Sequence, residues 1–189
     1  MSGPRIGLRR QARGLWTEVP RAELVAEAQA SGERMAAALS LRPGEDVLAA
    51  ESPDWPGTAV VLAACLAAGA VANVPESPAT AAAAARQLAP QVLVAAPSTW
   101  DAAVHSARAE IDLARGVGGW ALRQATTATR SGPLGRLAGA LARNRVRRRF
   151  GWQVARAAGS LGGPPEPATV EWLALFGLAV VTLDEEAER

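Results

Sequence analysis

The sequence has 189 residues, 49% of them hydrophobic and 20% charged, which is enough to bury one hydrophobic core and argues against disorder. All twenty basic residues are arginine, so Schiff-base catalysis and a phosphate-loop lysine are excluded. A single histidine, His105, excludes multi-histidine metal sites, and a single cysteine, Cys65, excludes an internal disulfide. Cys65 stands in an apolar helical pattern and is expected in the core. These counts indicate a reduced, cytoplasmic domain of the α/β or all-α class.

Neither export nor membrane insertion is indicated by the apolar pattern. The N-terminal segment 1–14 is basic, but it leads into a polar segment rather than into the apolar run of a signal peptide. The longest uncharged stretch, residues 57–75, is mainly Ala and Val and falls short of the roughly 20 strongly apolar residues that a spanning helix needs. We therefore expect a cytoplasmic protein that contacts a membrane only at its periphery, if at all.

The first half of the chain alternates between helical and extended patterns. Apolar residues recur at the helical period after residue 22, Arg42-Pro43-Gly44 ends that helix, and Gly69 has the position of a left-handed helix cap. The expected elements are a helix at 22–40, a strand at 46–50, a helix at 57–68, a strand at 70–74, a helix at 78–88 and a strand at 92–95. This order, with its short connections, predicts parallel β-α-β units in a doubly wound sheet.

From residue 97 the pattern is mainly helical, and it later returns to alternation. The expected elements are helices at 99–112, 120–130 and 134–150, a strand at 152–157, a Gly- and Pro-rich loop at 159–167, a helix at 168–176 and a strand at 178–183. The fold class is thus a three-layer α/β domain with a parallel sheet and a helical middle segment. Its expected parts are a basic arm at 1–20, a single domain at 21–183 (divided into 21–96, 97–150 and 151–183) and an acidic tail at 184–189.

Positive charge is concentrated in the middle of the chain. Residues 105–156 contain eleven Arg against two acids, Glu110 and Asp112, whereas residues 157–189 contain one Arg against six acids. The candidate anion-binding residues share the end of one predicted helix: Arg143, Arg145, Arg147, Arg148 and Arg149. Such a helix either binds an anionic lipid surface or an acidic partner, or is simply solvated. Nucleic acid is not expected as its partner.

Three stretches follow one another in the order of a known enzyme family. The first runs from Ala22 to Ala95 and contains Arg42-Pro43-Gly44-Glu45-Asp46-Val47, Ser52-Pro53-Asp54-Trp55, Ala68-Gly69-Ala70-Val71 and Val74-Pro75. The second is Pro97-Ser98-Thr99-Trp100-Asp101, and the third runs from Ala157-Ala158-Gly159-Ser160 to Val180. Together they resemble the long-chain fatty-acyl-CoA synthetases of the AMP-forming, adenylate-forming (AMP-binding) superfamily. The resemblance covers most of residues 22–181 and implies the N-terminal domain of such an enzyme.

The chain departs from that family where ATP is handled. In the family a Ser-, Thr- and Gly-rich phosphate loop ending in Lys follows the strand that corresponds to 92–95, but here Ala96 leads directly into Pro97. The family's tyrosine motif after the last strand is replaced by residues 181–186, and the sequence has no Tyr. The resemblance therefore implies a truncated, internally deleted homologue with no catalytic residue and no cofactor of its own. Loss of central strands also predicts sheet edges that must be paired anew or covered.

The glycine-rich segment after the predicted strand at 152–157 is the candidate nucleotide site. The resemblance places it beside the adenylate, and the carboxyl edge of a parallel sheet is where ligands often bind. The candidate residues are Gly159, Ser160, Gly162, Gly163 and Pro164. An ordinary tight turn is the alternative, since Gly and Pro favour turns without any ligand.

Three other groups carry reactive residue types but favour structural roles. Residues 126–136 imitate a phosphate loop, yet they follow a helical pattern and have Arg in place of Lys, so we expect a turn between helices. The acids at 184–188 are expected to form a charged tail rather than a magnesium site. Asp101, His105 and Ser106 share one helix, which favours a surface pair over a catalytic triad. No metal site is therefore expected.

Three functions remain open on the sequence alone. One is a degenerate synthetase homologue that does not catalyse acyl adenylation by itself and retains acyl-ligand or partner binding, with a full-length synthetase as one partner. The second is a subunit of a split long-chain fatty-acid-CoA ligase, which alone would need ATP and magnesium. The third is a peripheral membrane-binding module that uses the Arg-rich helix. A decayed gene product without function is the remaining alternative.

Overall fold

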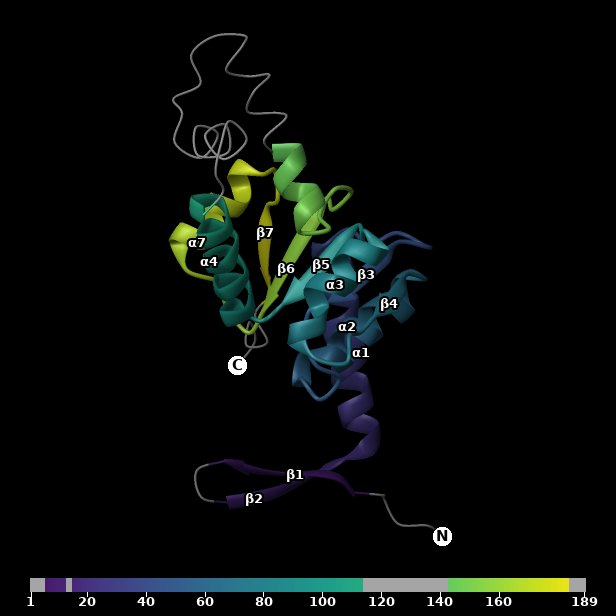
Figure 1. Ribbon diagram of the computed structural model, residues 1–189. Helices are drawn as coiled ribbons and strands as arrows, with labels where there is room; N and C mark the ends of the chain where they lie inside the picture. The colour runs from purple at the N-terminus through teal and green to yellow at the C-terminus, as the bar shows by residue number, and fades with distance from the viewer. Residues whose placement is uncertain (1–5, 13–14, 114–142, 184–189) are drawn as a thin grey trace.

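The computed structural model describes residues 6–12, 15–113 and 143–183 (Figure 1). A parallel sheet of five strands, in the order β4-β3-β5-β6-β7, forms the centre of the domain. Its strands are β3 (Asp46–Ala49), β4 (Val71–Asn73), β5 (Val92–Ala95), β6 (Ala157–Leu161) and β7 (Val180–Leu183). The helices are α1 (Arg21–Ala38), α2 (Pro56–Ala68), α3 (Pro78–Leu88), α4 (Pro97–Leu113) and α7 (Pro167–Leu175), with a further helical segment at 143–149. The predicted α/β class with a parallel sheet is confirmed.

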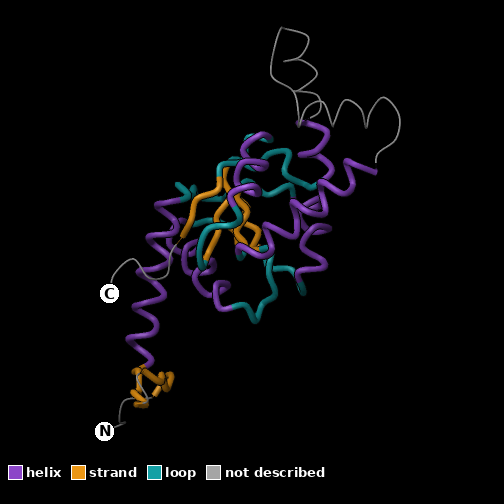
Figure 2. Tube along the Cα trace, turned by 90° about the vertical axis from the view of Figure 1, so that its left-hand side faces the viewer, coloured by secondary structure: helices purple, strands orange, loops and turns teal. Residues whose placement is uncertain are grey.

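Helices cover both faces of the sheet, which gives the three predicted layers (Figure 2). Side chains of the central strands alternate between the faces. Val47 and Val92 belong to the core that α1 and α2 cover, whereas Leu48 and Leu93 belong to the core that α3, α4 and α7 cover. A strand that is buried on both faces needs a nearly continuous apolar run, and β5 has one.

The helices α1 and α2 lie in direct contact on their face of the sheet. A Cβ atom at Gly32 would lie 2.7 Å from the backbone carbonyl carbon of Ala63, so only glycine allows this approach. Met35 of α1 and Cys65 of α2 are buried in the same core. Burial raises the pKa of the Cys65 thiol to about 11, so this side chain is an inert core residue, as predicted.

The strand β6 pairs directly with β5. Val92 lies opposite Ala157, and Ala95 lies opposite Ser160. The edge that missing central strands would leave on β5 is therefore paired within the chain, and the edges of the five-stranded sheet are β4 and β7.

The predicted strand at 152–157 is wrong, because β6 begins only at Ala157. The residues before it form turns that Arg147 holds in place. The Arg147 Nε–H donates to the carbonyl oxygen of Trp152 at 2.9 Å, and another guanidinium N–H donates to the carbonyl oxygen of Ala155. These side-chain bonds occupy carbonyl groups that a strand would offer to its neighbour.

The predicted loop at 159–167 is also partly wrong, since Gly159 and Ser160 belong to β6. Gly159 fits a crowded place in the sheet: a Cβ atom there would lie 3.0 Å from a methyl group of Leu183 and 3.3 Å from one of Leu39. Glycine usually weakens a strand, but at this position the neighbouring side chains come so close that glycine is favoured. The loop itself begins at Gly162.

The structure adds a hairpin to the N-terminal arm. The strands β1 (Ile6–Ala12) and β2 (Leu15–Pro20) pair antiparallel, with Leu8 opposite Val19. The hairpin lies at the far end of α1, away from the five-stranded sheet (Figures 1 and 2). Within the described ranges, no helix is long and apolar enough to cross a bilayer.

Candidate functional site

The candidate nucleotide residues lie at the end of β6 and in the loop that follows it. Ser160 is fully buried, and its hydroxyl donates to the carbonyl oxygen of Gly163 at 2.7 Å. Gly162 and Gly163 have φ angles of +91° and +129°, which favour glycine. The Gly162 N–H donates to the carbonyl oxygen of Leu183 at 3.2 Å. The conformation of this loop is thus fixed by contacts within the chain.

Trp100 of α4 connects the helix layer to the same strand. Its indole N–H donates to the carbonyl oxygen of Gly159 at 3.0 Å, and its side chain is only 3% exposed. Its ring lies edge-on to that of Trp152, with the ring centres 6.4 Å apart. The two indole rings therefore pack against each other between α4 and the sheet.

Glu51 is a functional candidate that the sequence analysis missed. It follows β3 at the carboxyl edge of the sheet, is 7% exposed, and accepts the N–H of Ala96 at 3.0 Å. Ala96 follows β5, so this carboxylate links the ends of two neighbouring strands. The available signal was its position, because an acid directly after a buried strand of a parallel sheet lies at the edge where ligands bind.

A groove of about 320 Å³ lies between α3 and α4. Its α3 wall is built from small side chains, including Ala81, Ala82 and Ala85. The sheet forms its floor, and the rings of Trp100, Trp152 and Phe150 form its aromatic lining. Ser98, Thr99 and Ser106 are its only hydroxyl-bearing residues among those described. A concave, mainly apolar site with a few polar groups is typical of small-molecule binding.

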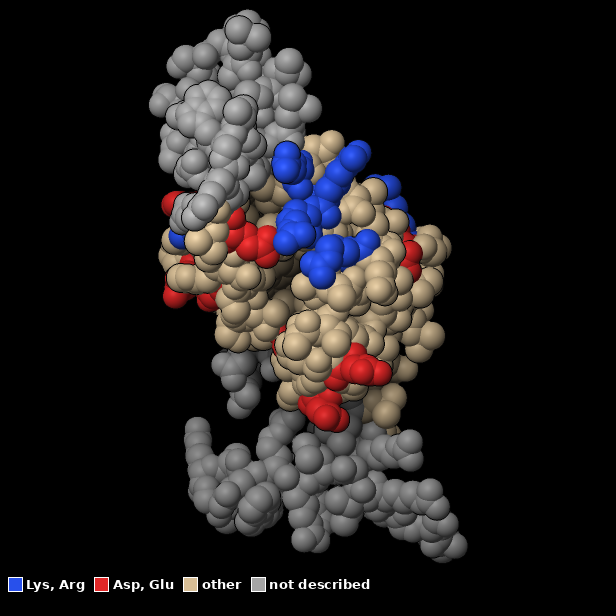
Figure 3. Space-filling view, viewed as in Figure 1, with Lys and Arg blue, Asp and Glu red and all other residues tan. Residues whose placement is uncertain are grey.

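A second hollow of about 520 Å³ adjoins the C-terminal ends of α3 and α4 and the helical segment 143–149. Four arginines line it: Arg86, Arg145, Arg148 and Arg149. Glu110 is the one acid among its described lining residues, and Phe150 lines both this hollow and the groove. In Figure 3 basic side chains gather above a hollow in this face of the molecule.

The five predicted anion-binding arginines do not share one environment. Arg145, Arg148 and Arg149 line the hollow, whereas Arg143 does not. Arg147 is half-buried and holds the turn before β6 together. The sequence pattern did not reveal Arg86, since it lies on α3, far from the Arg-rich helix along the chain.

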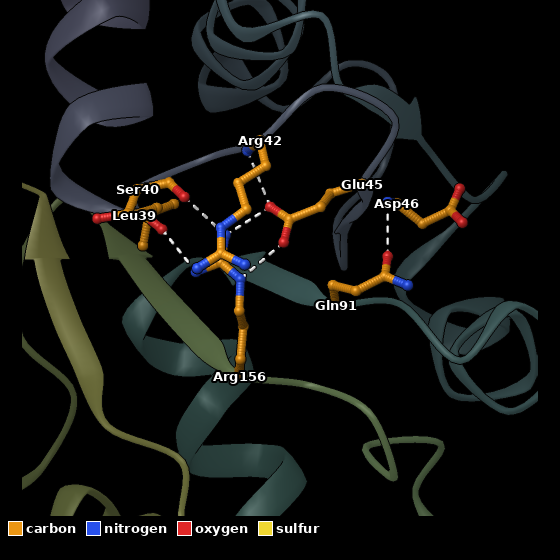
Figure 4. Close-up of polar contacts among 7 residues, drawn as sticks. All are labelled: Leu39, Ser40, Arg42, Glu45, Asp46, Gln91 and Arg156. Atoms are coloured by element: carbon orange, nitrogen blue, oxygen red, sulfur yellow. Dashed lines mark hydrogen bonds and ion pairs between the residues drawn. The ribbon is translucent and has the colours of Figure 1, made fainter.

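A polar cluster at the edge of the sheet where the strands begin fixes the start of β6 (Figure 4). Arg156 donates to the Glu45 carboxylate at 2.8 Å and to the carbonyl oxygen of Leu39, just beyond α1, at 3.0 Å. The hydrogen bond with Arg156 is the main reason why the pKa of Glu45 is lowered from 4.5. The main chain of Asp46 also bonds here, donating to the Gln91 side-chain oxygen at 2.7 Å. This cluster is structural.

The remaining candidates do not form a catalytic site in the described residues. The Asp101 carboxylate accepts the N–H of Glu166 at 3.1 Å, at the start of α7, which gives it a capping role. No group of three potential metal-binding side chains occurs within residues 6–12, 15–113 and 143–183. The segments 126–136 and 184–188 lie outside those ranges.

The fold matches one part of several solved adenylate-forming enzymes. A 2-hydroxyisobutyryl-CoA ligase in complex with 2-HIB-AMP and CoA matches over 94% of this chain, with 16% identity and a TM-score of 0.53. The adenylation domain of a carboxylate reductase from Mycobacterium chelonae matches over 92% of this chain, with 16% identity and a TM-score of 0.60. The corresponding domain from Segniliparus rugosus, solved with AMP and a co-purified carboxylic acid, matches over 96%, with 17% identity and a TM-score of 0.50.

These matches define the fold of the chain. The chain spans only 24% to 33% of the length of these structures. No protein-family model matches the sequence, and neither does any curated protein sequence. Residues 6–12, 15–113 and 143–183 thus have the fold of a fragment of the adenylate-forming enzymes, at an identity that establishes the fold alone.

Proposed function

We propose that this chain is a degenerate homologue of long-chain fatty-acyl-CoA synthetases that binds an acyl chain and does not adenylate it by itself. The observation that carries the proposal is the groove between α3 and α4, because its volume of about 320 Å³ and its apolar lining suit an alkyl chain. The fold match to acyl-CoA ligases and the motifs at 22–95 support the same chemistry.

The groups that are absent from the sequence support the proposed lack of independent adenylation. Phosphoryl chemistry on ATP needs a cation and backbone donors aimed at the phosphates. The chain has no lysine. Ala96 leads directly into α4, at the position where the synthetases that this sequence resembles have their phosphate loop. At the loop after β6, the Gly162 N–H already donates to Leu183.

Displacement of a fluorescent fatty acid by palmitate tests the acyl site. We expect saturable binding by the wild-type chain and at least about tenfold weaker binding by Ala103→Trp, because the indole would fill the groove that Ala103 lines. The matched control is Ala109→Trp, an exposed position on the same helix that does not line the groove. Absence of wild-type binding, or equal loss in both variants, would contradict acyl binding in the groove.

An ATP–pyrophosphate exchange assay with palmitate and magnesium tests the second half of the proposal. We expect no exchange by the chain alone. Exchange above background would show that this chain adenylates, and it would overturn the proposed degeneracy while leaving acyl binding intact.

A subunit of a split fatty-acid-CoA ligase is the second candidate, favoured by the observation that Ala96 leads directly into α4, so that a phosphate loop would have to come from another polypeptide. ATP and magnesium would then be cofactors of the assembled enzyme. The expected result is exchange activity that appears only when a polypeptide carrying a phosphate loop and a catalytic lysine is added. A membrane-binding role for the Arg-rich helix belongs to the same set of proposals and is tested below.

A further inference from the structure

We propose that the arginine-lined hollow and the groove together hold one single-chain amphiphile with a phosphate head group. The phosphate would lie on Arg86, Arg145 and Arg148, and the alkyl chain would pass Phe150 into the groove. This inference rests on the proposed acyl binding and adds the head-group chemistry and the direction of entry.

The first step is the charge of the hollow. Its described lining contains four guanidinium groups and one carboxylate, and only Arg149 pairs with that carboxylate, with Nε 3.0 Å from Glu110. Arg86, Arg145 and Arg148 have no carboxylate partner among the described residues. Three exposed guanidinium groups on two helical segments therefore face one concave site without internal neutralisation.

The second step compares this charge with the helix dipoles. The hollow adjoins the C-terminal ends of α3 and of the helical segment 143–149, each of which carries about −0.5 of an elementary charge. One arginine is offset by Glu110, so the charge of the other three guanidinium groups exceeds that of these helix ends by roughly two elementary charges. A phosphate monoester carries about −1.5 to −2 at neutral pH, which matches this excess better than a carboxylate does. Guanidinium groups also bind phosphate oxygens in a bidentate manner.

The third step is that the two cavities are adjacent. Phe150 lines both, and its ring centre lies 5.3 Å from that of Trp152, which lines the groove. Ala85 and Arg86 are neighbours on α3, yet the first lines the groove and the second the hollow. The lining therefore changes from apolar to cationic between two consecutive residues of α3. A ligand with an apolar chain and an anionic head group requires such a change.

The fourth step is direction. The hollow lies at the C-terminal ends of α3 and α4, at the edge of the sheet where the strands begin, whereas Glu51 and Gly162 lie at the opposite, carboxyl edge. An amphiphile held by the arginines thus has its head group at the edge remote from the candidate nucleotide loop.

Calorimetric titration with decyl phosphate, decanol and inorganic phosphate, each below its aggregation concentration, tests the proposal. We expect the full chain to bind decyl phosphate roughly ten- to a hundredfold more tightly than decanol at low salt, because the head group gains charge-assisted hydrogen bonds. The preference should shrink as salt is added. Inorganic phosphate alone should bind weakly or not at all.

The discriminating variant is Arg145→Gln with Arg148→Gln, and the matched control is Arg34→Gln with Arg42→Gln, which removes the same charge from exposed positions outside the hollow. The first pair should abolish the preference for decyl phosphate and leave decanol binding unchanged; the control should keep the preference. Equal binding of decyl phosphate and decanol by the wild type, or equal effects of both double variants, would overturn the head-group site while acyl binding stands.

Two further outcomes separate the two proposals. Failure of both decanol and decyl phosphate to bind would remove the acyl site itself, and with it this inference. Binding only to vesicles that contain phosphatidic acid, with no binding of free decyl phosphate, would assign the arginines to a membrane surface and overturn the head-group site.

Discussion

The two faces of the sheet use small residues to opposite effect. On the face covered by α1 and α2, Gly32 lets two helix backbones touch, and the space is closed by Met35 and Leu39. On the face covered by α3 and α4, alanines line a groove of about 320 Å³ that no larger side chain of the described residues fills. Small residues thus close a gap where helices cross closely, and they leave one open where large aromatic rings set the spacing.

The largest effect is expected on the closed face. Gly32→Leu places a branched side chain where even a Cβ atom would lie 2.7 Å from α2 backbone, so we expect a loss of about 3 kcal/mol or more in the free energy of unfolding. Urea unfolding measures it. The control, Gly44→Ala, has open space around its Cβ position but a φ of +77°, and should cost only about 1 kcal/mol. Equal losses in the two variants would mean that the α1–α2 contact is not tight.

A smaller effect is expected in the wall of the open face. Trp100→Phe removes the indole N–H and leaves the carbonyl oxygen of Gly159 without this donor, which should lower the free energy of unfolding by about 1–3 kcal/mol. Trp55→Phe is the control, because Trp55 is only partly buried and its side chain makes no hydrogen bond with another described residue. If the control costs as much, loss of ring size rather than loss of the hydrogen bond explains the effect.

A smaller effect again is expected in the cluster that ties the start of β6 to the end of α1. Arg156→Gln should cost about 1–2 kcal/mol at pH 7, since it removes a partly buried ion pair whose side chains are 29% and 13% exposed. Arg149→Gln breaks a pair that is 67% and 46% exposed and should cost less, about 0.5 kcal/mol.

The pH dependence of that difference has a definite sign. The pKa of Glu45 is lowered in the folded state, so its pair with Arg156 stabilises the fold above the ordinary value of 4.5 and loses this contribution as the pH falls below it. Thermal melts between pH 7 and pH 3 should therefore show wild type and Arg156→Gln converging in acid. A constant difference across this range would assign the loss to the carbonyl contacts of Arg156 instead.

The sequence predicted the first half of the chain better than the second half. Pro78 and Pro90 bracket an alanine-rich run, and α3 and β5 occur at the predicted residues. The sequence analysis ended β6 too early because Gly159 and Ser160 have low strand propensity, whereas their burial between β5 and β7 decides their conformation.

The groove and the hollow were beyond sequence reasoning for a different reason. The groove is lined by residues of α3, of α4 and of the segment 150–152, which are far apart along the chain, and the rings of Trp100 and Trp152 meet only in the folded structure. Arg86 and Glu110 also line the hollow, but they lie on α3 and α4, far along the chain from the charged residues at 143–149. Only the cationic character of that segment was readable in advance.

The central position of β5 has a consequence for hydrogen exchange. This strand is buried along its whole length and is bonded to β3 on one side and β6 on the other. Its amides, such as those of Leu93 and Val94, are therefore expected to exchange only through global unfolding. Slower exchange at β5 on addition of a ligand would report binding anywhere on the fold, whereas slower exchange confined to α3 and α4 would locate the ligand in the groove.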